Sequence, residues 1–219
     1  MSSLQIAERP SEHQPEGLLV LHHGRGTSEM DLLPLADMLD PDRRLHVAAP
    51  RAPLQLPGSP GYHWYLVPRV GYPDPNTFWA AREALAELHD ELWAQTGLGP
   101  EQTVLGGFSM GTVMSYALGL SADRPAPGGI MAFSGFIPTI EGWEPPLHDP
   151  RRHSTRVFIT HGRHDPIIEV DFGRAAHEAL ESAGFDTTYV ESEAAHNIEP
   201  AGLRSGTAWL HETLALTAS

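Results

Sequence analysis

Short apolar runs alternate along the chain with stretches in which apolar residues return every three or four positions. The first pattern is typical of strands that are buried on both faces, and the second of amphipathic helices. Buried strands are predicted at residues 17–21, 45–49, 102–108, 129–133, 157–160 and 187–190. Helices are predicted at residues 31–39, 76–95, 110–120, 169–183 and 203–216. This alternation predicts an α/β protein with a mostly parallel central sheet and helices on both of its faces.

Length and composition favour one globular domain over residues 1–219. A chain of 219 residues supports one sizeable core, and 41% hydrophobic with 19% charged residues is an ordinary globular composition. Residues 1–15 are polar, so we expect an N-terminal extension or an edge segment there. They lack the apolar run of a secretory signal, and no stretch of the chain is long and apolar enough to span a bilayer. A cytoplasmic protein without stable membrane insertion is therefore expected.

Charge and cysteine content exclude several classes of function. The formal net charge is -14, which repels the phosphates of nucleic acids and of anionic membranes, so neither is an expected partner. The chain has no cysteine, and this excludes disulfides, zinc–thiolate sites and a cysteine nucleophile.

Residues 107–111 read Gly-Phe-Ser-Met-Gly and match the motif G-x-S-x-G. The context fits the motif, because a predicted strand precedes Ser109 and a predicted helix follows it. In this arrangement the serine occupies a sharp, strained turn, and a side chain at either outer position would collide with the neighbouring strand or helix. The helix N-terminus beside the serine favours developing negative charge. Ser109 is therefore predicted to be a nucleophile.

A serine hydroxyl needs a histidine to accept its proton and a carboxylate to orient that histidine. In α/β hydrolases the acid and then the histidine follow the nucleophile, each in a loop after a strand. Asp165 follows the strand predicted at 157–160, and His196 follows the strand predicted at 187–190. We predict that Asp165 and His196 complete a catalytic triad. For Asp165 an alternative stays open, because Pro166 could begin a helix with Asp165 as its N-cap.

The tetrahedral intermediate of acyl transfer carries an oxyanion, which needs fixed hydrogen-bond donors. One predicted donor is the backbone N–H of Met110, directly after the nucleophile. The second is assigned to the backbone N–H of Arg25, in the glycine-containing loop 22–26 after an early strand. An ordinary turn between a strand and a helix is the alternative for this loop.

Two other classes of protein remain as alternatives. His161, His164 and Asp165 form an H-x-x-H-D sequence, and His22 and His23 could add ligands for a metal-dependent hydrolase. A loop after a strand does not place two histidines on one helical face, so this hypothesis is weaker than the triad. The other class is a ligand-binding protein of the same fold without catalytic activity.

Five segments together resemble the phospholipase/carboxylesterase family, which contains relatives of acyl-protein thioesterases. These segments are residues 21–26, 49–53 with Trp64 and Tyr65 after them, 107–111, 161–166 and 195–198. They keep the order of the family and cover nearly the whole chain. The resemblance implies a compact α/β-hydrolase fold with no large cap domain, activity on carboxylic esters, no cofactor, and a monomer or homodimer.

Two positions depart from the family pattern, which more often has leucine where Arg25 stands and glutamine where Met110 stands. Both positions contribute backbone N–H groups, so the reaction is expected to survive, while Arg25 brings a charge to the mouth of the pocket. Trp64 and Phe136 are expected to line the substrate pocket, with a simple core or rim position as the alternative for each.

The sequence thus predicts a serine carboxylesterase that hydrolyses small-molecule carboxylic esters through an acyl-enzyme intermediate. A thioesterase or lysophospholipase with the same triad is the alternative within this class, because the same residues serve all three reactions.

Overall fold

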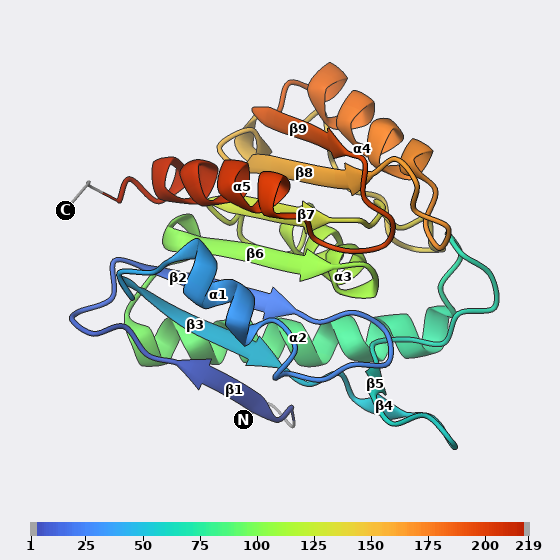
Figure 1. Ribbon diagram of the computed structural model, residues 1–219, viewed down its shortest axis with the longest axis horizontal. Coiled ribbons are helices and arrows are strands. Elements are labelled where there is room, and N and C mark those ends of the chain that lie inside the picture. Colours follow the sequence, from blue (N-terminus) through green and yellow to red (C-terminus); the bar gives the residue numbers. More distant parts are fainter. Residues whose placement is uncertain (1–3, 217–219) are drawn as a thin grey trace.

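The computed structural model of the protein describes residues 4–216 and has a seven-stranded sheet at its centre. Across the sheet the strands are β1 (Ile6–Arg9), β3 (Leu45–Pro50), β2 (Gly17–His22), β6 (Thr103–Phe108), β7 (Gly129–Phe133), β8 (Arg156–Gly162) and β9 (Thr187–Ser192). β1 runs antiparallel to β3, and all other neighbours in this sheet are parallel. The carboxyl ends of the parallel strands therefore lie along one edge, at the right in Figure 1.

Helices cover both faces of this sheet, as Figure 1 shows. One face carries α1 (Leu33–Leu39) and α5 (Pro200–Thr213), and the other carries α2 (Pro75–Thr96), α3 (Met110–Gly119) and α4 (Val170–Ala183). Shorter elements are the hairpin of β4 (Leu54–Gln55) with β5 (Tyr62–His63) and the 3-10 helices Pro100–Gln102 and Pro150–Arg152. The predicted α/β-hydrolase fold class, a mostly parallel sheet between helices, is confirmed.

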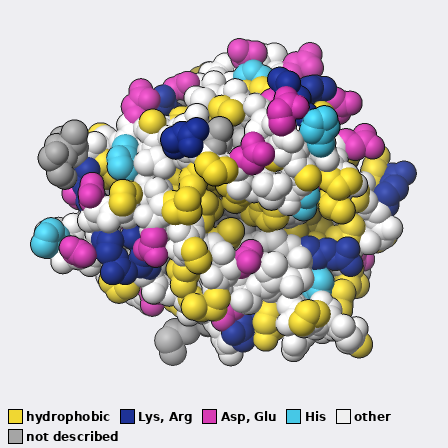
Figure 2. Space-filling view, viewed as in Figure 1, with side chains coloured by type: hydrophobic (Ala, Val, Ile, Leu, Met, Phe, Trp, Pro, Cys, Tyr) yellow, Lys and Arg dark blue, Asp and Glu magenta, His cyan; other side chains and the backbone are white. Residues whose placement is uncertain are grey.

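Each face of the sheet has its own apolar core. Phe78, Leu85 and Leu180 are fully buried on the face of α2, α3 and α4, whereas Leu39 and Leu210 are fully buried under α1 and α5. Figure 2 shows hydrophobic side chains gathered across the middle of the α1–α5 face. Two cores explain why the central strands are continuous apolar runs, because both faces of each strand must be apolar.

Most predicted elements differ from the sequence-based expectation at one or both ends, and the first helix, the last helix and the last strand are examples. The helix predicted at 31–39 begins at Leu33, and Pro34 lies in its first turn, where a fixed φ suits a helix start. The last helix begins at Pro200 instead of Leu203, for the same reason, and ends at Thr213. β9 continues to Ser192, two residues beyond the predicted strand.

The N-terminal segment contributes the antiparallel edge of the sheet. Residues 1–3 lie outside the described residues, and within 4–15 the strand β1 pairs with β3. The Arg9 side chain is buried and forms an ion pair with the buried Asp40. No helix within residues 4–216 has both the length and the apolar character that crossing a membrane requires.

Several histidines are buried, and burial is the largest cause of a lowered pKa in each. These are His22, His23, His63, His89 and His161. The pKa of His89, on α2, falls from 6.5 to about 3, because the ring is fully enclosed and, to a smaller extent, because of the Arg124 charge. The ring stacks on that of His22. A neutral imidazole is thus part of the folded core, and acid is expected to destabilise it.

The sign of this pH effect follows from proton uptake. Below about pH 6.5 an unfolded chain protonates His89 and the folded protein does not, so stability falls as the pH decreases. For this group alone the loss between pH 7 and pH 5 is about 2 kcal/mol. We expect His89→Leu to reduce the difference between the unfolding free energies at pH 7 and pH 5 by about 2 kcal/mol, measured by urea titration. The matched control is His13→Leu at an exposed position, and an unchanged pH dependence in the His89 variant contradicts the prediction.

Candidate active site

Ser109 lies at the junction of β6 and α3, with a φ of 55° and a ψ of -116°. This strained conformation occurs in a turn that lifts the side chain above the edge of the sheet. The two glycines of the motif permit the turn. A Cβ at Gly107 would lie 2.4 Å from the carbonyl carbon of Gly111, and a Cβ at Gly111 would lie 1.9 Å from the carbonyl oxygen of His22. The start of α3 therefore packs directly on the backbone at the end of β2.

Three side chains from three loops meet at this edge. His196 Nε2 lies 2.9 Å from Ser109 Oγ, and His196 Nδ1 lies 2.6 Å from Asp165 Oδ2. With Asp165 ionised, Nδ1–H donates to the carboxylate and Nε2 is left to accept the hydroxyl proton. The Asp165 carboxylate is fully buried, whereas the His196 ring remains 18% exposed. The three predicted triad residues are therefore in hydrogen-bond contact in the predicted order.

Asp165 also holds the turn that follows it. Its Oδ1 accepts hydrogen bonds from the backbone N–H groups of Ile167 (2.8 Å) and Ile168 (2.9 Å). The alternative role as a helix N-cap is wrong, because α4 begins only at Val170 and its N-cap is Glu169. Asp165 thus divides its two oxygens between its own loop and His196.

The two residues predicted to supply the oxyanion donors line the same cleft as the serine. Arg25, Ser109 and Met110 all line this cleft. Within residues 4–216 the backbone N–H groups of Arg25 and Met110 have no protein acceptor. Met110 is the first residue of α3, where an N–H has no partner within the helix. Both groups are therefore free to donate to a substrate oxygen.

Trp64 does not line the substrate cleft, which corrects the expectation drawn from the sequence. Its side chain is fully buried, and its indole N–H donates to the carbonyl of His23 over 2.9 Å. His23 itself bridges two loops, because its Nδ1 lies 2.7 Å from the carbonyl of Gly24 and its Nε2 accepts from the backbone N–H of Ala52. Trp64 and His23 thus fix the loop that carries Arg25 through buried hydrogen bonds.

Phe136 does line the cleft, as expected. The cleft is small, with a volume of about 70 Å³, and its other walls come from the 65–73 segment and from Ile167 and Ile168. Phe136 also borders a larger groove of about 660 Å³ between the 136–147 segment and α4. Phe136 borders both spaces, whereas Phe172, whose ring centroid lies 5.3 Å from that of Phe136, lines only the groove.

The histidines of the metal-site alternative are not brought together. His161 is buried and its Nε2 lies 2.8 Å from the carbonyl of Ile168, whereas His164 is 68% exposed beside Glu193. His22 is fully buried with its Nδ1 on Ser115. Among the described side chains, no group of three or more His, Asp or Glu is arranged to hold a metal ion.

The sequence did not assign His23 and His161 their supporting roles, and within the aromatic segment 50–75 it did not single out the cleft residues Tyr65, Arg69 and Tyr72. Burial is the largest cause of the lowered pKa of His161, so it is a neutral ring that anchors Ile168 beside Asp165. Thirteen histidines offered no pattern that separates these roles. The aromatic character of the 50–75 loop was the available signal for the cleft wall.

A mostly parallel sheet with a serine, a histidine and an aspartate in contact at the carboxyl ends of its strands defines an α/β hydrolase. The chain belongs to the phospholipase/carboxylesterase family, whose model matches residues 4–214. The resemblance inferred from the sequence is thereby confirmed. Membership in a family of ester hydrolases supports the prediction that the protein is an ester-hydrolysing enzyme.

Named relatives include thioesterases and esterases. Acyl-protein thioesterase 1 of Debaryomyces hansenii is 31% identical over 144 residues, which are 62% of this chain and 61% of that protein. The matched segment spans only 40% of acyl-protein thioesterase 1 from Gibberella zeae, so this chain spans less than two thirds of both relatives. Esterase YpfH of Escherichia coli is 27% identical over 190 residues, 84% of this chain and 75% of that protein.

Solved structures extend the likeness over the full fold. Esterase PE8 is 30% identical, with a TM-score of 0.81 over 96% of this chain and 99% of that one. The carboxylesterase of Bacillus cereus has a TM-score of 0.83 at 22% identity, over 97% of this chain and 95% of that one, and at this identity it shows the fold alone.

The close packing around Gly111 of the G-x-S-x-G motif predicts that one added methyl group destabilises the fold. Gly111→Ala would place a Cβ 1.9 Å from the carbonyl of His22, and neither backbone segment can move without disturbing the sheet. We expect a loss of stability larger than the roughly 1–3 kcal/mol typical of overpacking, seen as a lower melting temperature or as failure to fold. The matched control is Gly206→Ala in α5, where the nearest atom would lie at 3.4 Å. A Gly111 variant that melts like the wild type contradicts this packing.

Proposed function

We propose that the protein is a serine carboxylesterase with Ser109 as nucleophile, His196 as general base and acid, and Asp165 as the residue that orients His196. The observation that carries the proposal is the pair of hydrogen bonds that joins the three side chains, 2.9 Å and 2.6 Å long. The cleft beside Ser109 supports a small-molecule ester as substrate. The family and the esterase named among its relatives support the same bond type.

The first half-reaction forms an acyl-enzyme. Ser109 Oγ attacks the carbonyl carbon of the ester while His196 Nε2 takes its proton, and Asp165 stabilises the imidazolium that forms. The N–H groups of Met110 and Arg25 hydrogen-bond the oxyanion of the tetrahedral intermediate. When this intermediate collapses, the C–O bond to the alcohol breaks, and the alcohol leaves with the proton from His196 Nε2.

The second half-reaction returns the enzyme to its starting state. Water attacks the acyl-enzyme with His196 Nε2 as base, the same two N–H groups hold the second oxyanion, and Ser109 recovers its proton as the acid leaves. No step needs a cofactor. A thioesterase is the second candidate, because thioester cleavage uses the same groups and several relatives are named acyl-protein thioesterases.

Removal of the nucleophile is the direct test. We expect Ser109→Ala to lower kcat/KM for p-nitrophenyl butyrate by about 10⁴-fold or more, because the acyl-enzyme can no longer form. A fluorophosphonate should add once to the wild type, at Ser109, and not to the variant, as read from intact and peptide masses. Ser182→Ala, an exposed serine on α4, is the control. A near-normal rate in the Ser109 variant would falsify the proposed mechanism.

Assays with p-nitrophenyl thiobutyrate beside the oxygen ester separate the two candidate functions. A kcat/KM higher for the oxygen ester supports the carboxylesterase, and a much higher value for the thioester favours the thioesterase. Both substrates share the acyl chain, so the cleft contributes equally to each comparison.

The hydrogen bond from Trp64 to the loop 22–26, which carries the predicted oxyanion donor Arg25, gives a second kinetic prediction. Trp64→Phe removes the N–H that donates to the His23 carbonyl and leaves space in the core, so the Arg25 N–H loses its fixed position. We expect kcat and kcat/KM to fall together by about 10-fold, with little change in KM, because the lost interaction exists only in the transition state. Trp79→Phe, on α2, makes the same substitution where the indole N–H donates to the Glu141 carbonyl at the surface, and it is the control. A rise in KM alone would assign Trp64 to substrate binding.

A further inference from the structure

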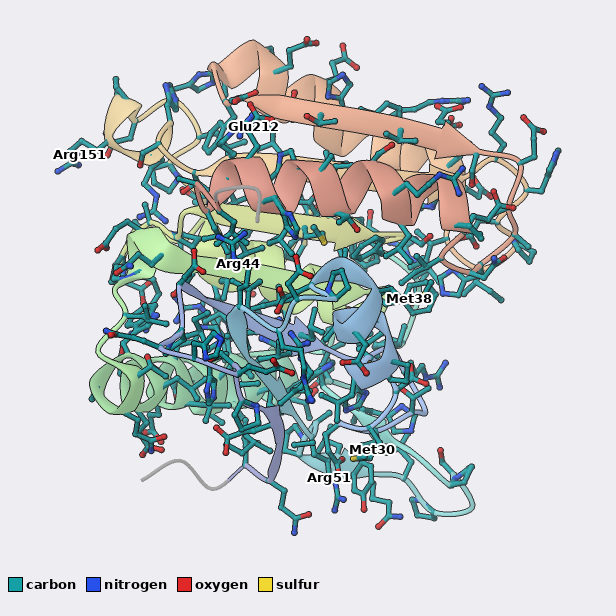
Figure 3. All side chains as sticks on the ribbon, turned by 60° about the vertical axis from the view of Figure 1, so that its left-hand side comes forward. Met30, Met38, Arg44, Arg51, Arg151 and Glu212 are labelled. Carbon is teal, nitrogen blue, oxygen red and sulfur yellow. The ribbon has the colours of Figure 1, made fainter. Side chains whose placement is uncertain are left out.

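Two arginines that form no ion pair with another described residue line the cleft beside Ser109. All 14 cationic side chains of the protein are arginines, in a chain of net charge -14. Most of them form ion pairs with carboxylates, including Arg44 with Glu16, Arg51 with Glu29 and Arg151 with Asp149. Figure 3 labels these three arginines, which lie on different parts of the molecule.

Arg25 and Arg69 differ from this majority. Both line the Ser109 cleft, and within residues 4–216 neither guanidinium forms an ion pair. Arg69 stacks on Tyr72, with its guanidinium carbon 3.7 Å from the ring centroid, which holds the charge at the cleft wall. Arg25 is exposed and lies in the loop that also offers its backbone N–H to the cleft. Two unpaired cations therefore flank one small apolar cavity.

The position of His196 tells which half of an ester occupies this cleft. The cleft is lined by Ser109 and Met110, and His196 is not among its walls. His196 instead lines a hollow on its other side, together with Phe108 and Asp31. The departing alcohol takes its proton from His196 and so lies on that side. The acyl group therefore occupies the cleft that is lined by the two arginines.

The dimensions of the cleft limit the acyl chain. Its volume of about 70 Å³ suits a short chain, and the larger groove is a separate space that shares Phe136 and Gly71 with the cleft. A short acyl group in this position brings its far end to the wall that carries Arg69. A guanidinium binds a carboxylate through two parallel N–H···O hydrogen bonds. Local positive charge is also what an acidic protein needs to attract an anionic substrate.

We propose that the acyl group of the preferred substrate is short and ends in a carboxylate, so that the substrate is a monoester or monothioester of a small dicarboxylic acid. Arg25 and Arg69 bind the free carboxylate while Ser109 attacks the ester carbonyl at the other end. This assignment rests on the proposed serine esterase function, since it uses the same nucleophile and the same cleft.

The test compares two esters that differ in this group alone, monoethyl glutarate and ethyl pentanoate, with released ethanol as the readout. For the wild type we expect a kcat/KM ratio of charged to neutral ester above one, decreasing as NaCl screens the charges. Arg69→Gln and Arg25→Gln should each lower this ratio about 10-fold, as expected for loss of one charged hydrogen-bonding partner. The matched control is Arg43→Gln, another exposed arginine, which lies before β3 and outside the cleft, and the ratio should stay at its wild-type value.

Three results overturn the assignment. They are a wild-type ratio below one, a ratio that neither cleft variant changes, and a higher kcat/KM for ethyl decanoate than for monoethyl glutarate, which would assign the long groove to the acyl chain. If ethyl pentanoate is cleaved in a Ser109-dependent manner in these cases, the esterase function stands and only the substrate class is wrong. If no ester is cleaved and Ser109 resists fluorophosphonate, the esterase function itself has failed and the substrate class fails with it.

Discussion

The site depends on a steric constraint at the end of two strands, where β2, β6 and α3 come together without side chains between them. Gly111 packs against the carbonyl of His22, and Gly107 packs against Gly111. A non-glycine residue with positive φ costs on the order of 1–3 kcal/mol and persists only where the surroundings hold it. Here the Ser109 N–H donates to the carbonyl of Phe133 over 2.9 Å, which ties the strained turn to β7. The direction of the hydroxyl, the free N–H of Met110 and the path of the 22–26 loop all follow from this contact.

Polar groups buried behind the cleft keep its loops in place. His23 links the loop of Arg25 to Ala52, and the indole N–H of Trp64 donates to the His23 carbonyl. His161 holds Ile168, whose N–H in turn bonds Asp165. Each of these contacts is enclosed by protein, where an unsatisfied donor or acceptor costs more than at the surface. The site is therefore rigid on the side away from the substrate, which is the condition for preorganised electrostatic stabilisation.

The sequence predicted those parts that depend on short motifs and on chain order. Ser109 was found because G-x-S-x-G stood between a strand and a helix, and Asp165 and His196 because only one candidate of each kind followed a suitable strand. The burial of Trp64 could not be predicted, because it depends on how the segment 50–75 packs against the loop 22–26. The segment 50–75 has no periodicity, so its aromatic character indicated a cleft wall but did not single out Arg69 and Tyr72. The observed starts of α1 and α5 differ from the predicted ones because Pro34 and Pro200 lie in the first turns of these helices. The spacing of apolar residues carries no information on this local effect.

The two tasks of Asp165 restrict how this position can change during evolution. One oxygen receives the N–H groups of Ile167 and Ile168, and the other receives His196 Nδ1–H. Glutamate also appears as the acid in α/β hydrolases. Its extra methylene would carry the carboxylate away from one set of donors whenever it satisfied the other. An exchange of aspartate for glutamate here would therefore require the turn at 165–168 to be rebuilt at the same time.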